Sequence, residues 1–126
     1  MAYYNFQNET VFTYWQIGKM IVEKQGGESR ANYGEGIIKE LSTRLTKYFG
    51  KGFTINNLRY MRQFYLTFKK RHALSGELSW THYRLLLHVE NEQARNFYIK
   101  EAIGGNWSTR QLEREINTFS YQRSNR

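Results

Sequence analysis

Apolar residues recur at helical spacing along most of this chain, and this pattern leaves little room for any fold but a helical one. Ile37, Ile38, Leu41, Leu45 and Tyr48, for example, follow the 3.6-residue period of an α-helix. Stretches that strictly alternate apolar and polar residues, which would indicate half-buried strands, are rare, and proline is absent. The sequence therefore predicts an all-α fold, a compact bundle of five or six helices with no sheet.

Glycines and capping residues mark the ends of the expected helices. The expected ranges are 5–24, 35–49, 55–70, 81–89, 92–103 and 109–121. Gly50 is a natural stop for the second range. Thr54, Asn91 and Ser108 are the expected N-caps of the third, fifth and last ranges. At 126 residues the chain is long enough to bury one sizeable core, so a single helical domain over residues 1–126 is predicted.

Positive charge is concentrated in one part of the chain. The formal net charge is +8, and every acidic residue is a glutamate. No acidic residue lies between Glu40 and Glu77, and this acid-free segment contains Arg44, Lys47, Lys51, Arg59, Arg62, Lys69, Lys70 and Arg71. A positive field confined to one region favours a polyanionic partner, with nucleic acid first and an anionic membrane surface second. A basic face that only aids solubility is the alternative.

The stretch GKGFTINNLRYMRQFY, residues 50–65, joins a glycine-containing turn to a helix with two different faces. On a helical wheel, most of the aromatic and apolar residues occupy one half, which we expect to face the core. The other half is mainly basic and polar. A helix, a short turn and a second helix with a capped start is the layout of a helix-turn-helix unit, here residues 37–70.

In a helix-turn-helix unit the second helix enters the major groove, and its first turns reach the base edges. The residue types that pair well with bases are Asn56, Arg59, Arg62 and Gln63. Asn57 lies nearer the apolar half, so it is expected to cap or pack instead. The expected phosphate contacts, which position a protein on DNA, are Lys47, Lys51, Lys69 and Lys70.

A second helix-turn-helix candidate lies near the C-terminus, where the turn GGNW precedes STRQLEREI. Arg110 and Arg114 would be its secondary DNA contacts, together with Gln111. Glu113 and Glu115 share the same helix and would repel phosphates. A solvated helix face is the favoured interpretation of this segment.

Four stretches resemble the N-terminal domain of the YhcG-like bacterial proteins: YWQIGKMIVE, GKGFTINNLRYMRQFY, LSWTHYRLLLHVENEQARNFYIKEAI and NWSTRQLEREI. The resemblance spans roughly residues 10–122. Full-length members of that family join this helical domain to a C-terminal PD-(D/E)XK nuclease domain. The resemblance implies that this chain is the DNA-binding or targeting half of a nuclease, with DNA and the nuclease domain as its partners.

The residues needed for nuclease chemistry are missing from this chain. A PD-(D/E)XK site uses an aspartate and an acid-X-lysine pair to hold a divalent metal beside the scissile phosphate. The sequence contains no aspartate and no Glu-X-Lys. The chain is therefore predicted not to be an enzyme by itself, and no catalytic residue is assigned. Whether it is an excised domain or a natural truncation stays open.

Metal and cofactor sites are not predicted either. There is no cysteine, and His82 and His88 would fall about 240° apart on a continuous helix, which does not suit a shared metal ion. No glycine-rich turn is followed by Gly-Lys-Ser/Thr, so nucleotide binding has no support. His82, next to Trp80, is expected to make a half-buried polar contact.

A protein–protein docking or dimerisation module is the alternative function. Phe12, Tyr14 and Trp15 lie near one another on the first expected helix, and exposed aromatic residues can anchor an interface. A homodimer is compatible with both functions, because helix-turn-helix dimers bind paired half-sites. The two can be told apart by salt, since only nucleic-acid binding should weaken steeply as the salt concentration rises.

A cytoplasmic location is expected, with no membrane partner. The longest uninterrupted apolar run is about four residues, far below the roughly 20 that a membrane-spanning helix needs. The N-terminal stretch MAYYNFQNETVF has neither a basic start nor the apolar core of a secretory signal.

Overall fold

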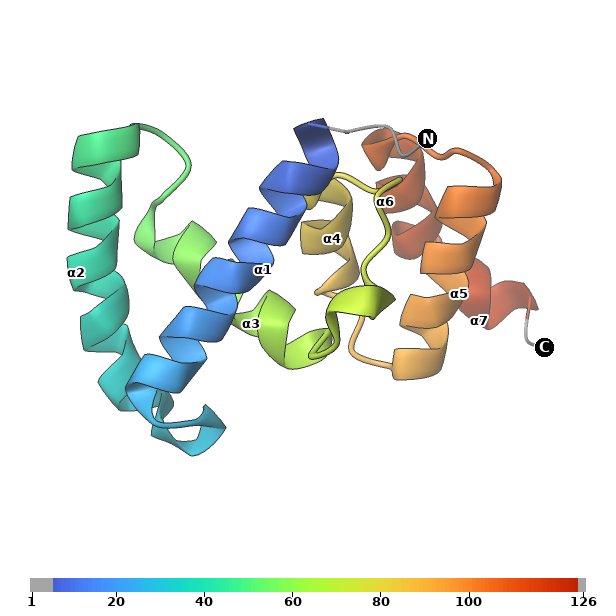
Figure 1. Cartoon of the computed structure of the whole chain (residues 1–126). Helices are drawn as coiled ribbons and strands as arrows, with labels where there is room; N and C mark the ends of the chain where they lie inside the picture. The colour runs from blue at the N-terminus through green and yellow to red at the C-terminus, as the bar shows by residue number, and fades with distance from the viewer. Residues whose placement is uncertain (1–5, 125–126) are drawn as a thin grey trace. The chain divides into compact units, whose positions relative to one another are not determined.

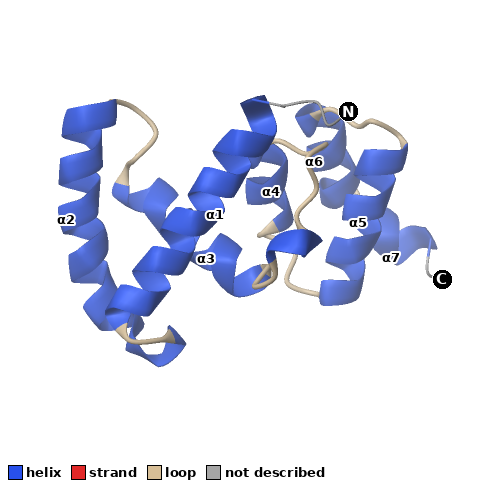
Figure 2. Ribbon diagram, viewed as in Figure 1, coloured by secondary structure: helices blue, strands red, loops and turns tan. Residues whose placement is uncertain are grey.

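The computed structural model describes residues 6–124, and within that range the chain is helical, with loops and no strand (Figures 1 and 2). The helices are α1 (Phe6–Gln25), α2 (Ala31–Phe49), α3 (Ile55–Thr67), α4 (Trp80–Leu86), α5 (Glu92–Gly104), α6 (Thr109–Asn117) and α7 (Ser120–Ser124). Two short 3-10 turns, η1 (Glu28–Arg30) and η2 (Arg71–Ala73), precede α2 and follow α3. The all-α prediction is confirmed.

The described residues form seven α-helices, where five or six were predicted. The difference arises at the C-terminal end, where one helix was expected over residues 109–121. Phe119 has a φ of 58°, which lies in the left-handed region and cannot continue a right-handed helix. α6 therefore ends at Asn117, and a separate helix, α7, begins at Ser120. Similarly, α3 ends at Thr67 rather than Lys70, because Phe68 leaves the helical region with a ψ of 71°.

The predicted N-caps are confirmed. The Thr54 hydroxyl accepts a hydrogen bond from the backbone N–H of Asn57 at 3.0 Å. The Asn91 and Ser108 side chains accept bonds of 2.8 and 3.1 Å from the N–H groups three residues further on. A reciprocal capping box that was not predicted occurs at the start of α4, where Ser79 and His82 each cap the other's backbone N–H.

The chain divides into two compact units, residues 10–74 and residues 75–126 with 1–9. The prediction of a single domain over residues 1–126 stays a prediction. Among the described residues, no helix combines the length and the apolar character that crossing a membrane requires.

The unit of residues 10–74 is built on α1, α2 and α3. Its buried apolar side chains are Val11, Trp15, Ile21, Val22, Ile38, Leu58, Met61, Phe64 and Phe68. The expectation that the aromatic half of α3 faces the core is confirmed at Phe64, which is 0% exposed. α1 and α3 approach closely at Gly18, where a Cβ atom would overlap the carbonyl group of Met61. Only glycine fits at this crossing.

The apolar stripe of α2 does not stay buried over its whole length. Gly34 and Ile38, in its first half, are buried, but Tyr48 is 73% exposed and Phe49 is 70% exposed. The periodic position of Tyr48 therefore does not bring it into the core.

The unit of residues 75–126 with 1–9 has its own buried core. Its buried side chains are Leu78, Tyr83, Leu86, Leu87, Val89, Ala94, Tyr98, Ala102 and Leu112. α4 packs against α6, and α5 packs against α7. The expected half-buried contact of His82 is confirmed, since its Nε2 atom lies 2.9 Å from the Trp107 carbonyl oxygen. Burial raises the pKa of Tyr83, whose hydroxyl accepts a 2.7 Å bond from the Ser75 N–H.

Candidate nucleic-acid interface

Two of the predicted groove contacts, Arg59 and Arg62, are held by one carboxylate. α2 packs against α3, which brings Glu35 from the first half of α2 to the basic half of α3. Arg59 donates from Nε to Glu35 Oε1 at 2.7 Å, and its second contact with the same oxygen is 2.6 Å long. Arg62 donates to Glu35 Oε2 at 2.9 Å. Both guanidinium groups are therefore engaged inside the unit.

Arg62 is bound more deeply than Arg59. Its side chain is 14% exposed, against 48% for Arg59. The Nη1 atom of Arg62 lies 3.3 Å from both the Gln25 Oε1 atom and the Ala31 carbonyl oxygen. Gln25 is itself 1% exposed and donates to the Gly27 carbonyl oxygen at 2.8 Å. Arg62 thus belongs to a polar network that joins the end of α1 to the start of α2.

The two arginines lower the pKa of Glu35. The largest cause is the hydrogen bond from Arg59, and the nearby positive charge of both guanidinium groups adds to it, while partial burial of the carboxylate acts in the opposite direction. Glu35 is therefore ionised and paired at neutral pH. Sequence reasoning missed this pairing, because Glu35 lies 24 and 27 residues before its partners and outside the acid-free segment.

The remaining predicted groove residues differ in their surroundings. Asn56 and Gln63 are exposed on α3. Asn57, expected to cap or pack, does so: its Nδ2 donates to the Gly52 carbonyl oxygen at 2.6 Å. A further bond of 2.6 Å runs from the Ser42 hydroxyl to the Phe53 carbonyl oxygen. These two bonds fasten the turn of residues 50–54 to the helices on either side of it.

Three cations at the end of α2 and in the turn after it are not neutralised in this way. Arg44, Lys47 and Lys51 are exposed, and none of them makes an ion pair with a carboxylate among residues 6–124. Lys69, by contrast, lies 3.9 Å from Glu28, and both side chains are mostly exposed. Lys70 is also exposed. Three exposed cations without an ion pair among the described residues therefore lie within residues 44–51.

Two large aromatic side chains lie among these cations. The exposed pair Tyr48 and Phe49 ends α2, and the Lys47 ammonium lies 5.7 Å from the centre of the Tyr48 ring. The Phe49 ring packs at a tilt against the Phe53 ring, with ring centres 6.2 Å apart. We call Arg44, Lys47, Tyr48, Phe49 and Lys51 the α2 tip.

The aromatic residues behind the docking alternative are engaged within the same unit. Trp15 is 7% exposed and donates from its indole nitrogen to the Phe68 carbonyl oxygen at 2.6 Å. Phe12 stacks on Trp15 and lies under the Arg71 guanidinium, 3.8 Å from it. Tyr14 packs its edge against Phe53. None of the three forms the exposed aromatic cluster on which that alternative was based.

The secondary candidates Arg110 and Arg114 lie on α6, in the other unit. Both are exposed. Glu113 is exposed on the same helix, and Glu115 is half-buried. The mixed charge of this face is as the sequence suggested, and nothing in the geometry of α6 distinguishes it as a binding surface.

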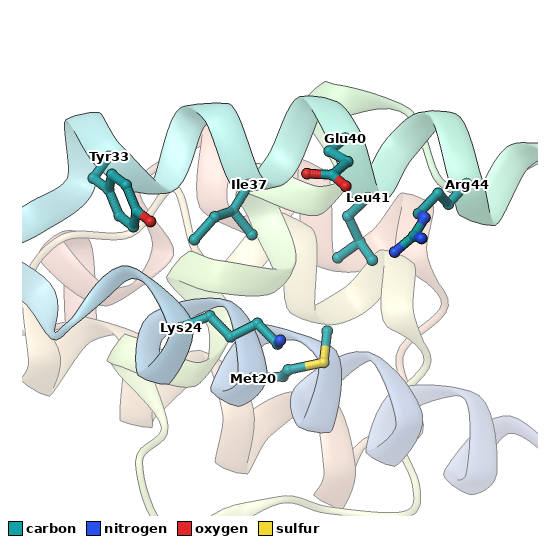
Figure 3. Close-up of a pocket in the computed structure, with 7 residues that line it drawn as sticks. All are labelled: Met20, Lys24, Tyr33, Ile37, Glu40, Leu41 and Arg44. Atoms are coloured by element: carbon teal, nitrogen blue, oxygen red, sulfur yellow. The ribbon is translucent and has the colours of Figure 1, made fainter.

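A pocket of about 480 Å³ lies between α1 and α2 (Figure 3). Met20, Ile37 and Leu41 provide its apolar side chains, and the rest of its lining consists of Lys24, Tyr33, Glu40 and Arg44. Glu40 places a negative charge beside the two cations, so the pocket is a poor site for a phosphate. Within residues 6–124, no three histidine or acidic side chains gather closely enough to hold a metal ion.

Comparison with known proteins gives the chain a family. The sequence model of the DUF1016 N-terminal domain matches residues 1–123. The chain belongs to the DUF1016 N-terminal domain family. A relative from Escherichia coli (strain K12), described as "Putative nuclease YhcG", is 40% identical over an alignment 145 positions long, gaps included, which covers 89% of this chain. The predicted resemblance is confirmed.

The chain corresponds to only part of that relative. It spans 39% of the relative's length, as an N-terminal domain of a longer protein would. No solved structure matches the sequence.

Proposed function

We propose that this DUF1016 N-terminal domain binds DNA without cutting it and positions a nuclease domain carried by the longer proteins of its family. The binding surface is in the unit of residues 10–74. The chemistry of cleavage belongs to another part of those proteins, because this chain offers no aspartate and no acid-X-lysine pair. A cytoplasmic location is part of the proposal, since bacterial DNA lies there.

The exposed positive charge of the α2 tip is the observation that carries this proposal. Arg44, Lys47 and Lys51 lie in the acid-free segment and make no ion pair among the described residues, and only Arg44 has a carboxylate, Glu40, in the lining of the same pocket. Unpaired cations of this kind bind phosphates and release the counterions condensed on DNA, which supplies most of the sequence-independent affinity. Cations that served only solubility would be interspersed with acidic residues, whereas the 36 consecutive residues 41–76 contain none.

The DNA contacts of α3 are likewise assigned to side chains that are exposed. Arg59 keeps an exposed half and can turn one nitrogen toward DNA while it stays beside Glu35. Asn56, Gln63 and Lys70 are exposed on or next to the same helix. Arg62 is assigned a structural role, because reaching DNA would break its partly buried contacts with Gln25 and Glu35.

Fluorescence anisotropy of a labelled 20-base-pair duplex tests the proposal. The wild-type chain is compared with Lys47→Gln/Lys51→Gln and with a control of equal net charge, Lys39→Gln/Lys100→Gln, in which both lysines are exposed. We expect the tip variant to bind several-fold more weakly, and the slope of log K against log salt to fall by about 1 for each phosphate that is no longer bound. The control should stay close to wild type.

Two results would reject the proposal. If the wild-type chain binds no DNA at low salt, the basic surface is only solvated. If the control loses as much affinity as the tip variant, binding follows net charge and not this surface. Salt-insensitive self-association, measured by sedimentation, would favour the docking or dimerisation module instead.

A further inference from the structure

The α2 tip combines exposed rings with cations in a way that a duplex-binding surface does not need. Tyr48 and Phe49 are adjacent on a helix, so their side chains diverge by about 100°. Both are at least 70% exposed, and neither contributes to the buried core. Isolated exposed aromatics are common, but two together at a helix end within a cluster of unpaired cations form a distinct chemical surface.

This surface offers the two interactions that an unpaired nucleotide requires. The free faces of the rings can stack on a base, which is possible only where the base is not already stacked between its neighbours in a duplex. Lys47 lies 5.7 Å from the Tyr48 ring centre, so a phosphate bound by its ammonium would be close to a base on that ring. Arg44 and Lys51 add positive charge on either side of the ring pair in the sequence.

Several contacts hold the turn that follows the two rings. Gly50 and Gly52 have φ values of 80° and 106°, which glycine adopts without strain. The Ser42–Phe53 and Asn57–Gly52 hydrogen bonds, both 2.6 Å long, fasten the turn at its two ends. Phe53 supports Phe49 from behind and packs in turn on Tyr14. A turn that is already held in place loses little conformational entropy on binding.

We infer that the α2 tip binds DNA at unpaired bases, so that the domain prefers single-stranded arms or fork junctions to intact duplex. This inference rests on the proposed DNA binding and narrows its substrate class. A protein surface or an anionic membrane is a less suitable occupant, because stacking and dense negative charge occur together in a nucleic acid strand.

The test compares three labelled probes of equal length, a blunt duplex, a duplex with a forked end and a single strand, each bound to the 126-residue chain. We expect the fork and the single strand to bind more tightly than the duplex. Tyr48→Ala/Phe49→Ala should remove that preference, with affinity for these two probes falling about 5- to 150-fold for each stacked ring. Its salt slope should stay unchanged, because the cations that bind phosphate are all still present.

A second readout reports stacking directly. A 2-aminopurine base placed in the unpaired arm should be quenched by the wild-type chain and by Tyr48→Phe/Phe49→Tyr, which keeps both rings, but not by the alanine variant. Circular dichroism and the melting temperature of the alanine variant should match wild type, because both side chains are mostly exposed.

The outcomes separate this inference from the proposed function. Binding of all three probes with equal affinity, insensitive to the alanine variant, overturns the inference and leaves DNA binding intact. Binding of no probe at all rejects both. Self-association of the wild-type chain, or its adhesion to phosphatidylglycerol vesicles, that the alanine variant abolishes would assign the rings to a protein or lipid surface and overturn the inference.

Discussion

Glu35 is the residue that decides which arginines of the basic segment are available. Each of its two carboxylate oxygens binds one arginine, at 2.6–2.9 Å, which is the length of a charge-assisted hydrogen bond. The exposed half of this network contributes little, because exposed ion pairs are typically worth less than about 1 kcal/mol. The ion pair between Arg62 and Glu35 contributes more to stability, because a mostly buried charge that loses its partner destabilises the fold.

We therefore expect Glu35→Gln to lower the free energy of unfolding by about 1–3 kcal/mol, since it leaves Arg62 without its carboxylate. Urea titrations followed by circular dichroism measure this. Glu23→Gln is the matched control, because Glu23 pairs with Lys19 at 3.8 Å with both side chains about half exposed or more. Glu23→Gln should lower the free energy of unfolding by less than about 0.5 kcal/mol. Equal costs for the two variants would contradict a structural role for Glu35.

The difference in stability between wild type and Glu35→Gln should depend on pH. The pKa of Glu35 is lowered in the folded chain from its ordinary value of 4.5, so the carboxylate stabilises the fold when it is ionised. That stability is fully present above pH 4.5 and is lost as the pH falls through the lowered folded pKa. The stability gap between wild type and Glu35→Gln should therefore be constant at neutral pH and should narrow in acid. A gap that widened in acid would contradict the assigned direction.

At the scale of elements, the position of α3 depends on a single helix crossing. α1 carries no side chain at Gly18, and the backbone of α3 at Met61 occupies that space. α3 buries Leu58, Met61 and Phe64 in the core, while Arg59 on its basic half stays about half exposed. A glycine inside a helix costs up to about 1 kcal/mol relative to alanine, and here the close packing offsets that cost.

Two glycine variants test this crossing. Gly18→Ala should destabilise the chain by about 1–3 kcal/mol, because the added methyl group meets a backbone carbonyl that cannot move independently. Gly36→Ala is the control. Gly36 lies inside α2 with open space around it, so alanine should stabilise the helix by up to about 1 kcal/mol. Thermal and urea unfolding measure both, and a stabilising Gly18→Ala would show that the helices do not cross closely.

At the scale of the whole molecule, the net charge of +8 acts on binding and on stability in opposite directions. Salt screens phosphate contacts and so weakens DNA binding. Salt also screens the repulsion among the clustered cations, which favours the folded chain. The two effects can be separated by measuring both on the same sample.

Raising NaCl from about 50 to about 200 mM should weaken duplex binding by about 40- to 500-fold if roughly three to five phosphates are contacted. Over the same range the melting temperature should not fall. Anisotropy and differential scanning fluorimetry measure the two quantities. A parallel loss of affinity and of thermal stability would mean that salt acts by unfolding the chain.

Helix formation and the capping positions could be predicted from the sequence because they depend on interactions within about four residues. The caps at Thr54, Asn91 and Ser108 are examples, and so is the aromatic core face of α3. The break at Phe119 could not be predicted, since nothing local requires a phenylalanine to adopt a positive φ.

The charge cluster of residues 41–76 and the family resemblance were likewise determined by the sequence alone. Which of those charges remain free was decided only by the tertiary structure, through the packing of α2 on α3. That packing places Glu35 beside two arginines more than 20 residues away and leaves Tyr48 and Phe49 exposed beyond it. Helical periodicity assigns a residue to a face of its own helix, but only the neighbouring helices determine how much of that face is covered.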